Sequence, residues 1–127
     1  MKPQAGAFLE KAHALLRQAD VMLEVRLTDA AGRTAYLAGV HAAQALIFER
    51  TGKVARRHRG VQGQLHMLTK DEPDFDIELR AFLGRTYNLK AIADYETGPG
   101  SEISVAQAEQ AVREAERFIA CIETLLA

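Results

Sequence analysis

The chain has 127 residues, and its 16 Lys and Arg against 17 Asp and Glu give a net charge of −1 at pH 7. This balance excludes a general electrostatic attraction to nucleic acid or membrane as the organising property of the molecule. Hydrophobic residues make up 48% of the chain, enough for a globular core. We expect one domain covering residues 1–127. The single Cys121 excludes an internal disulfide.

The composition also argues against a membrane segment, a leader and a metal site. The longest apolar-leaning run, residues 35–48, contains His41 and Gln44 and is too short to span a bilayer. Glu10 and Lys11 precede any apolar stretch, which is not typical of a signal peptide. No His, Cys or carboxylate spacing matches a zinc or di-iron site. We therefore expect a cytoplasmic protein without membrane association, metal or cofactor.

Two long helices are predicted in the first half of the chain. Residues 4–26 carry apolar side chains at alternating spacings of three and four, the pattern of a bundle helix. The stripe of this first helix consists of Ala5, Phe8, Ala12, Leu15, Ala19 and Met22. A second helix is predicted from Thr28 to about Thr51, where Gly52 stops it.

The middle of the second helix is rich in small residues that let neighbouring helices approach closely, so we expect it to be the central helix. Residues 34–48 also carry more apolar surface than the neighbours in a small bundle need. This surplus predicts a homodimer.

A basic stretch and a short helix follow. Residues 53–59, KVARRHR, hold the one concentration of positive charge. A solvated loop is the default interpretation, and binding of phosphate or RNA backbone is the sharper alternative. A short third helix is predicted from about Val61 to Thr69. The residues expected to bind RNA or nucleotide are Arg33, Lys53, Arg56, Arg57 and Arg59.

The second half of the chain predicts two more long helices. The fourth is expected to run from Asp74 to Tyr95, with Pro73 at its first turn. The fifth opens with a capping box formed by Ser104 and Gln107. Its core stripe consists of Val105, Ala108, Val112, Ala115, Ile119, Ile122 and Leu126. The predicted fold is all-α: an antiparallel up-down bundle of four long helices plus one short helix.

A polar cluster at the end of the fourth predicted helix is the candidate site. Lys90 and Asp94 are four residues apart and share a helix face, and Tyr95 follows directly. His41 and His58 are held in reserve as catalytic candidates. For His41, a core histidine satisfied by one hydrogen bond is the favoured interpretation.

The order of four motifs along the chain resembles the HEPN domain family, in particular its small stand-alone prokaryotic branch. The motifs are Gly32-Arg33-Thr-Ala-Tyr36, His41-Ala-Ala-x-Ala-Leu46, Arg57-His58-Arg-Gly60-Val61 and Asn88-Leu-Lys90-x3-Asp94-Tyr95. The resemblance covers residues 8–126. It implies an antiparallel helical bundle, commonly a homodimer, and often a minimal nucleotidyltransferase as the antitoxin partner.

The toxic members of the family that this chain resembles are metal-independent ribonucleases with an Arg-x4-6-His motif. Here Lys90 occupies the arginine position, and Tyr95 lies five residues on, where the shortest motif places histidine. Lysine lacks the bidentate fork of arginine, and a tyrosine hydroxyl is a poor general base at neutral pH. The motif is therefore degenerate, and we expect little or no ribonuclease activity.

Three interpretations of the cluster remain open. The preferred one is a module that binds RNA, a nucleotide or the partner through Lys90, Asp94 and Tyr95. The alternative is a ribonuclease toxin in which Lys90 and Tyr95 replace the usual pair, with His41 or His58 contributing. In the third, Lys90 and Asp94 form only a helix salt bridge, and Tyr95 packs the helix end.

Overall fold

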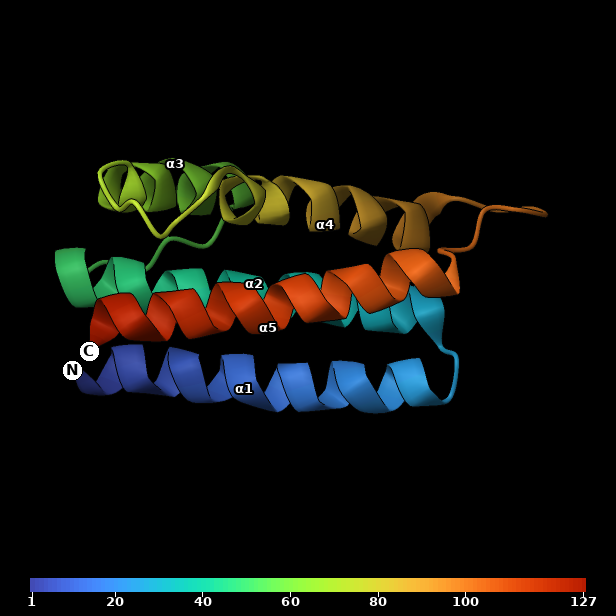
Figure 1. The fold of residues 1–127 in the computed structure, drawn as a ribbon, viewed down its shortest axis with the longest axis horizontal. Helices are drawn as coiled ribbons and strands as arrows, with labels where there is room; N and C mark the ends of the chain where they lie inside the picture. Colours follow the sequence, from blue (N-terminus) through green and yellow to red (C-terminus); the bar gives the residue numbers. More distant parts are fainter.

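The computed structural model describes residues 1–127 and contains five helices and no strand. The helices are α1 (Pro3–Glu24), α2 (Thr28–Thr51), α3 (His58–Thr69), α4 (Ile77–Tyr95) and α5 (Val105–Leu126). The four long helices lie side by side along the molecule, α1 and α4 running one way and α2 and α5 the other (Figure 1). The all-α bundle of long helices with one shorter helix is confirmed.

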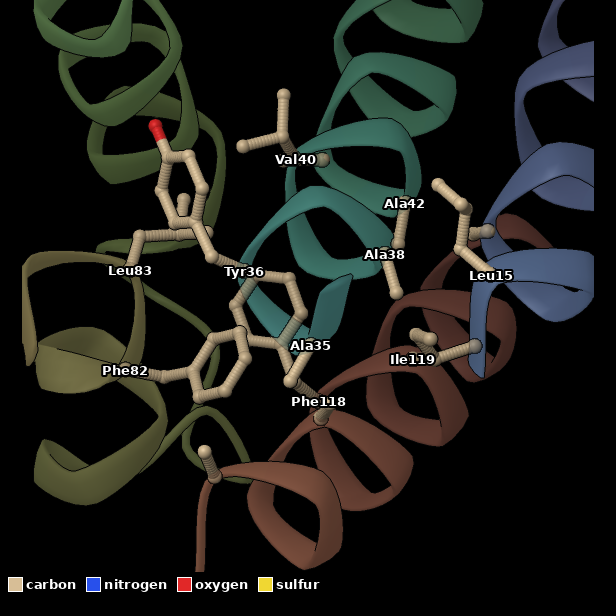
Figure 2. Close-up of a cluster of buried hydrophobic side chains, with 14 of the residues drawn as sticks. Leu15, Ala35, Tyr36, Ala38, Val40, Ala42, Phe82, Leu83, Phe118 and Ile119 are labelled. Carbon is tan, nitrogen blue, oxygen red and sulfur yellow. The ribbon is translucent and has the colours of Figure 1, made fainter. Parts of the chain in front are cut away.

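Helix α2 is the centre of the bundle, as its small residues predict, and it packs against the other four helices. Ala35 and Ala38 are fully buried, and Figure 2 shows Phe82 of α4 and Phe118 of α5 beside them. Gly39 makes the closest approach: a Cβ atom there would lie 2.4 Å from Cε2 of Phe82. Most of the apolar residues of α2 are thus buried within a single chain, and Leu37 and Phe48 are half-buried.

The core stripes of α1 and α5 are confirmed. Ala12 and Ala19 of α1 are fully buried, and Ile119 and Ile122 of α5 are at most 1% exposed. The capping box of α5 is also present. The Gln107 amide donates to Ser104 Oγ at 3.1 Å, and the Ser104 amide donates to Gln107 Oε1 at 3.0 Å.

Helix α4 begins at Ile77, so the prediction that it begins at Asp74 after a first-turn proline is wrong. Asp76 is the N-cap, and its Oδ1 accepts a hydrogen bond from the Leu79 amide at 3.0 Å. Pro73 lies in the preceding turn. Phe75, 2% exposed, meets the Phe118 ring edge-on with centroids 5.8 Å apart. Its aromatic ring belongs to the core although its backbone is not helical.

Helix α3 begins at His58, three residues before the predicted start at Val61. Arg57 has extended backbone and precedes the first turn, which closes when the Val61 amide donates to the Arg57 carbonyl at 2.9 Å. Helix α1 ends at Glu24, shortly before Arg26, which has a φ of 64°. No helix of the structure is both long and apolar enough to cross a membrane.

Candidate functional site

Two cations from different helices meet at one carboxylate. Lys90 Nζ donates to Asp94 Oδ2 at 2.7 Å, the pairing that their spacing on α4 predicts. Arg33 of α2 donates from Nε to Asp94 Oδ1, also at 2.7 Å. Because the two oxygens of Asp94 are used separately, both cations are fixed in place at the junction of α2 and α4.

The protonation states of this trio follow from its hydrogen bonds. The bonds from Lys90, then from Arg33, hold the pKa of Asp94 below its ordinary value. The bond to Asp94 raises the pKa of Lys90. Asp94 and Lys90 are therefore both charged at neutral pH, and the guanidinium of Arg33 brings the trio to a net positive charge. The side chains of Arg33, Lys90 and Asp94 are 38%, 28% and 22% exposed, so an anion in solvent can reach the cations.

An aromatic cluster lies on the same pair of helices, where α3 begins. Tyr36 Oη and His58 Nδ1 are 2.9 Å apart, and Figure 2 shows the Tyr36 hydroxyl directed toward α3. The His58 ring stacks on the Tyr87 ring with centroids 3.9 Å apart and planes 16° apart. Tyr36 meets Tyr87 edge-on at 5.6 Å. Three helices therefore contribute one ring each.

Burial, followed by the neighbouring Tyr87, raises the pKa of Tyr36 to about 12, so its hydroxyl stays protonated. Burial lowers the pKa of His58, so the imidazole is neutral at pH 7. The hydroxyl of Tyr36 has no other acceptor, and donation to Nδ1 is the arrangement that satisfies both groups. The remaining proton of neutral His58 is then on Nε2, which is a hydrogen-bond donor.

The charged trio and the aromatic cluster form one line. Tyr87, Lys90 and Asp94 follow at three and four residues along α4, and Arg33 and Tyr36 are one turn apart on α2. We call this surface the α2–α4 ridge. The ridge consists of Arg33, Tyr36, His58, Tyr87, Lys90 and Asp94. Tyr87 was missed from the sequence, although its place one turn before Lys90 is the signal that would have found it.

Tyr95 is not part of the ridge. It is 77% exposed, it makes no hydrogen bond through its side chain, and the α-helix ends there. The interpretation in which Tyr95 packs the helix end is therefore wrong. The salt bridge between Lys90 and Asp94, which belonged to the same interpretation, is present.

His41 also lies away from the ridge. Its Nδ1 pairs with Gln44 Oε1 at 2.8 Å, and its ring lies against Phe8 of α1. Eight residues separate it from Arg33 on α2, a rise of about 12 Å. The favoured interpretation of His41, one satisfying hydrogen bond, agrees with this contact.

The predicted RNA-binding residues outside the ridge lie on the stretch that connects α2 to α3 and on the first turn of α3. Lys53, Arg56, Arg57 and Arg59 are exposed, and none of them forms an ion pair. The stretch runs back along α2, because the carbonyl of Ala55 accepts a hydrogen bond from Gln44 Nε2 at 2.8 Å. It reaches the ridge at His58, so Arg57 is adjacent to the aromatic cluster.

No three His, Cys, Asp or Glu side chains are grouped as metal ligands would be.

A solved structure described as the crystal structure of TT1696 from Thermus thermophilus is similar to the chain, with a TM-score of 0.77. The two sequences are 23% identical, and the match covers 97% of this chain and 98% of the other. The similarity shows a shared fold. No curated protein matches the chain. The model of the HEPN domain matches residues 5–125, and the chain therefore belongs to the HEPN domain family.

Proposed function

We propose that the chain is a binding module for RNA or nucleotide phosphate, and that it pairs with a minimal nucleotidyltransferase in a toxin–antitoxin-type system. The observation that carries the binding proposal is the convergence of Arg33 and Lys90 on Asp94, each at 2.7 Å. The carboxylate orients both cations in advance, which reduces the entropy lost when they bind a ligand.

The donors left free on the ridge fit a phosphodiester. Arg33 uses only Nε on Asp94, so its two terminal nitrogens can form a bidentate pair with phosphate oxygens. Lys90 has two further N–H groups. One turn along, the Tyr87 ring is 41% exposed and offers a surface on which an unpaired base can stack. The cationic connection at residues 53–59 extends the positive path beyond His58.

RNA binding is tested by fluorescence anisotropy with a labelled single-stranded RNA at fixed salt. We expect Lys90→Ala and Arg33→Ala each to weaken binding by about tenfold, since each removes a charged phosphate contact. The matched control is Arg113→Ala, because Arg113 is exposed on α5 and forms no ion pair. Equal losses in all three variants would mean that net charge, and not the ridge, determines the binding.

The partner proposal has a separate test. We expect the gene of this chain to lie beside that of a minimal nucleotidyltransferase, and the two proteins to copurify after coexpression. Coexpression with Tyr95→Ala addresses whether the exposed ring at the end of α4 contributes to the partner contact. A nucleotidyltransferase that elutes separately from the wild-type chain would contradict the pairing.

A metal-independent ribonuclease is the second candidate function. The specific observation in its favour is that His58, fixed by Tyr36, lies on the same ridge as Lys90. A cation can stabilise the charge of the phosphorane while an imidazole transfers a proton. In the arrangement described above, however, Nδ1 of His58 is occupied and Nε2 carries the proton, so the neutral ring is not a ready base.

We expect little or no cleavage of a mixed RNA in EDTA by the wild-type chain. Lys90→Ala, His58→Ala and Tyr95→Phe separate the sources of any cleavage. Strong wild-type cleavage that the changes at Lys90 and His58 both abolish would establish the ribonuclease and place it on the ridge. Loss in Lys90→Ala and Tyr95→Phe with activity kept in His58→Ala would instead favour the Lys90–Tyr95 pair.

A further inference from the structure

A hollow of about 440 Å³ lies between α3 and α4. Both helices pack against α2, but their own backbones hardly approach each other, and Figure 1 shows them in the same layer of the molecule. The space that remains between them is large enough for a small ligand. None of the residues that line it belongs to the α2–α4 ridge, so the hollow is a separate candidate site.

The hollow combines an apolar floor with positive charge. Leu65 of α3, Phe75 of the turn before α4, and Leu83 of α4 line it, and each is at most 5% exposed. Its charged side chains are Arg59 on α3 and Arg80 on α4, and no Asp or Glu side chain lines it. A cavity that carries charge of one sign attracts the opposite charge. The lining therefore favours an anion with an apolar body.

Arg80 is the only half-buried Lys or Arg side chain of the chain that lacks a carboxylate partner. The other two half-buried cations are Arg33 and Lys90, and both pair with Asp94. A cation that is partly removed from water without a countercharge loses part of its hydration free energy. An anion bound in the hollow supplies the missing countercharge.

The Arg80 guanidinium is held in place, and part of it remains free. Both of its hydrogen bonds come from Nη2, and the shorter one reaches the carbonyl oxygen of Thr69 at 2.7 Å. Its Cζ lies 5.3 Å from the centre of the Phe75 ring. Nε and Nη1 form no hydrogen bond in the chain, and they carry three N–H groups. An anion can therefore bind Arg80 without breaking the contact that positions it.

The helix ends beside the hollow favour an anion with a single charge. Thr69 lines the hollow and is the last residue of α3, so the negative end of that helix dipole lies there. The positive end of α4 is already capped by the carboxylate of Asp76. A phosphate monoester carries a charge of about −1.5 to −2 at pH 7. A carboxylate, with one charge, fits these surroundings better.

We propose that the hollow between α3 and α4 binds an aromatic monocarboxylate. The carboxylate accepts a hydrogen bond from a free nitrogen of Arg80 and pairs with Arg59 at the rim. The ring lies over the apolar floor, where an aromatic contact with Phe75 adds to the burial of apolar surface. No residue of the ridge takes part, so the site is independent of RNA binding there.

The probe is hydrocinnamate, which has one ring, a short linker and one carboxylate. NMR titration of the labelled protein measures its affinity, and the Nε–H signal of Arg80 reports whether the ligand reaches the guanidinium. Three analogues each change one part of the probe. Hydrocinnamamide removes the charge, acetate removes the ring, and phenethyl phosphate adds a second charge. We expect each analogue to bind about tenfold more weakly, the loss typical of one missing or mismatched contact.

Two glycines of α3 give a matched pair of variants. Gly63 lines the hollow, and nothing lies within 4 Å of a Cβ atom there. Gly63→Leu should fill the hollow and weaken hydrocinnamate binding by about tenfold or more. Its melting temperature should not fall, because leucine is the better helix former. Gly60→Leu is the control, since Gly60 is equally open on the same helix but lies outside this hollow. It should bind as the wild type does.

Arg80→Met tests the recognition of the carboxylate. We expect it to lower the affinity for hydrocinnamate to that for hydrocinnamamide and to leave the affinity for the amide unchanged. If Arg80 served only to hold the end of α3, its loss would weaken both ligands alike. Lys90→Ala, on the ridge, should bind hydrocinnamate as the wild type does.

Several results would overturn the proposal. Equal affinities for hydrocinnamate and its amide would show that the carboxylate is not recognised, and tighter binding of phenethyl phosphate would show that a phosphate is preferred. No binding at millimolar concentration, or an unchanged affinity in Gly63→Leu, would exclude this hollow as the site. Loss of hydrocinnamate binding in Lys90→Ala alone would move the ligand to the ridge. The proposed function fails separately, because its test is RNA binding by the ridge variants.

Discussion

Gly39 shows how one residue sets the distance between two helices. The helix there has no side chain, and Cε2 of Phe82 occupies the space that a Cβ atom would take. Phe82 is itself fully buried, between α2 and Phe118. A well-packed interior leaves no room for the ring to move aside without disturbing its neighbours.

We therefore expect Gly39→Ala to destabilise the protein by about 1–3 kcal/mol through overpacking, despite the better helix propensity of alanine. Gly60→Ala is the matched control, because nothing lies within 4 Å of a Cβ atom there and Gly60 is also helical. That change should be neutral or stabilising by up to about 1 kcal/mol. Urea unfolding of both variants measures the difference, and a Gly39→Ala variant as stable as the wild type would contradict the packing argument.

The two half-buried histidines give the stability a pH dependence. Burial lowers the pKa of both His41 and His58 in the folded chain. The unfolded chain, with an ordinary histidine pKa near ~6.5, then binds protons more readily than the folded chain. The stability that follows from this difference is present above the ordinary histidine pKa of ~6.5. It is lost as the pH falls through the pKa values that His41 and His58 have in the folded chain.

The melting temperature should accordingly decrease as the pH is lowered from about 7 to about 5. His58→Phe keeps a ring against Tyr87 and removes one titrating group, so its melting temperature should change less over the same range. The carboxylates of Asp76 and Asp94 have lowered pKa values, so their protonation affects the melting temperature only in more acidic solution. A wild-type melting temperature that is constant from pH 7 to pH 5 would show that the histidines do not carry this dependence.

At the scale of whole helices, apolar periodicity predicted most of what the structure shows. The core stripes of α1 and α5, the cap of α5 and the stop at Gly52 all depend on local spacing and backbone preference. The start of α4 does not follow from local spacing and backbone preference. Phe75 belongs to the core although it precedes the helix, so periodicity extended the helix too far. Only tertiary contacts distinguish a buried residue in a turn from a buried residue in the first turn of a helix.

The sequence likewise predicts only part of the candidate site. The pair of Lys90 and Asp94 follows from a spacing of four within one helix. Arg33 joins it across 61 residues of sequence, and the contact of Tyr36 with His58 depends on the path of the connection between α2 and α3. Such contacts are set by how the helices pack, and no spacing within one helix encodes them.

Helix α5 offers a test of its rotation. Ile119 is 1% exposed, so Ile119→Asp would bury a carboxylate without a partner and should cost about 4 kcal/mol or more, or prevent folding. Glu116 is exposed three residues away and forms no ion pair. Glu116→Ala should change the stability by less than about 0.5 kcal/mol. Circular dichroism during heating compares the two, and similar losses would mean that the buried face is assigned incorrectly.

The whole chain exposes 7176 Å² of surface, and most of the apolar residues of its α2 helix are already buried within one chain. The apolar surface between residues 34 and 48, from which the sequence predicts a dimer, is mostly buried by the neighbouring helices. We therefore expect a dimer to use mainly other surface. Helix α4 packs against α2 and α5. Its Ile77, Ala81 and Asn88 are exposed and mark an open side, and Ile77 is 81% exposed.

We still expect a homodimer, now through the open side of α4. A stable interface takes about 800 Å² from each partner, near a tenth of the surface of this chain. Light scattering at micromolar concentration should return about twice the 14.0 kDa chain mass. Ile77→Glu should shift the mass toward that of one chain without lowering the melting temperature of the monomer, because the side chain is exposed there.

Val21→Glu, at a position 58% exposed on α1, is the control and should remain dimeric. A wild-type mass of one chain would rule out the dimer, and dissociation by Val21→Glu instead would place the interface on α1.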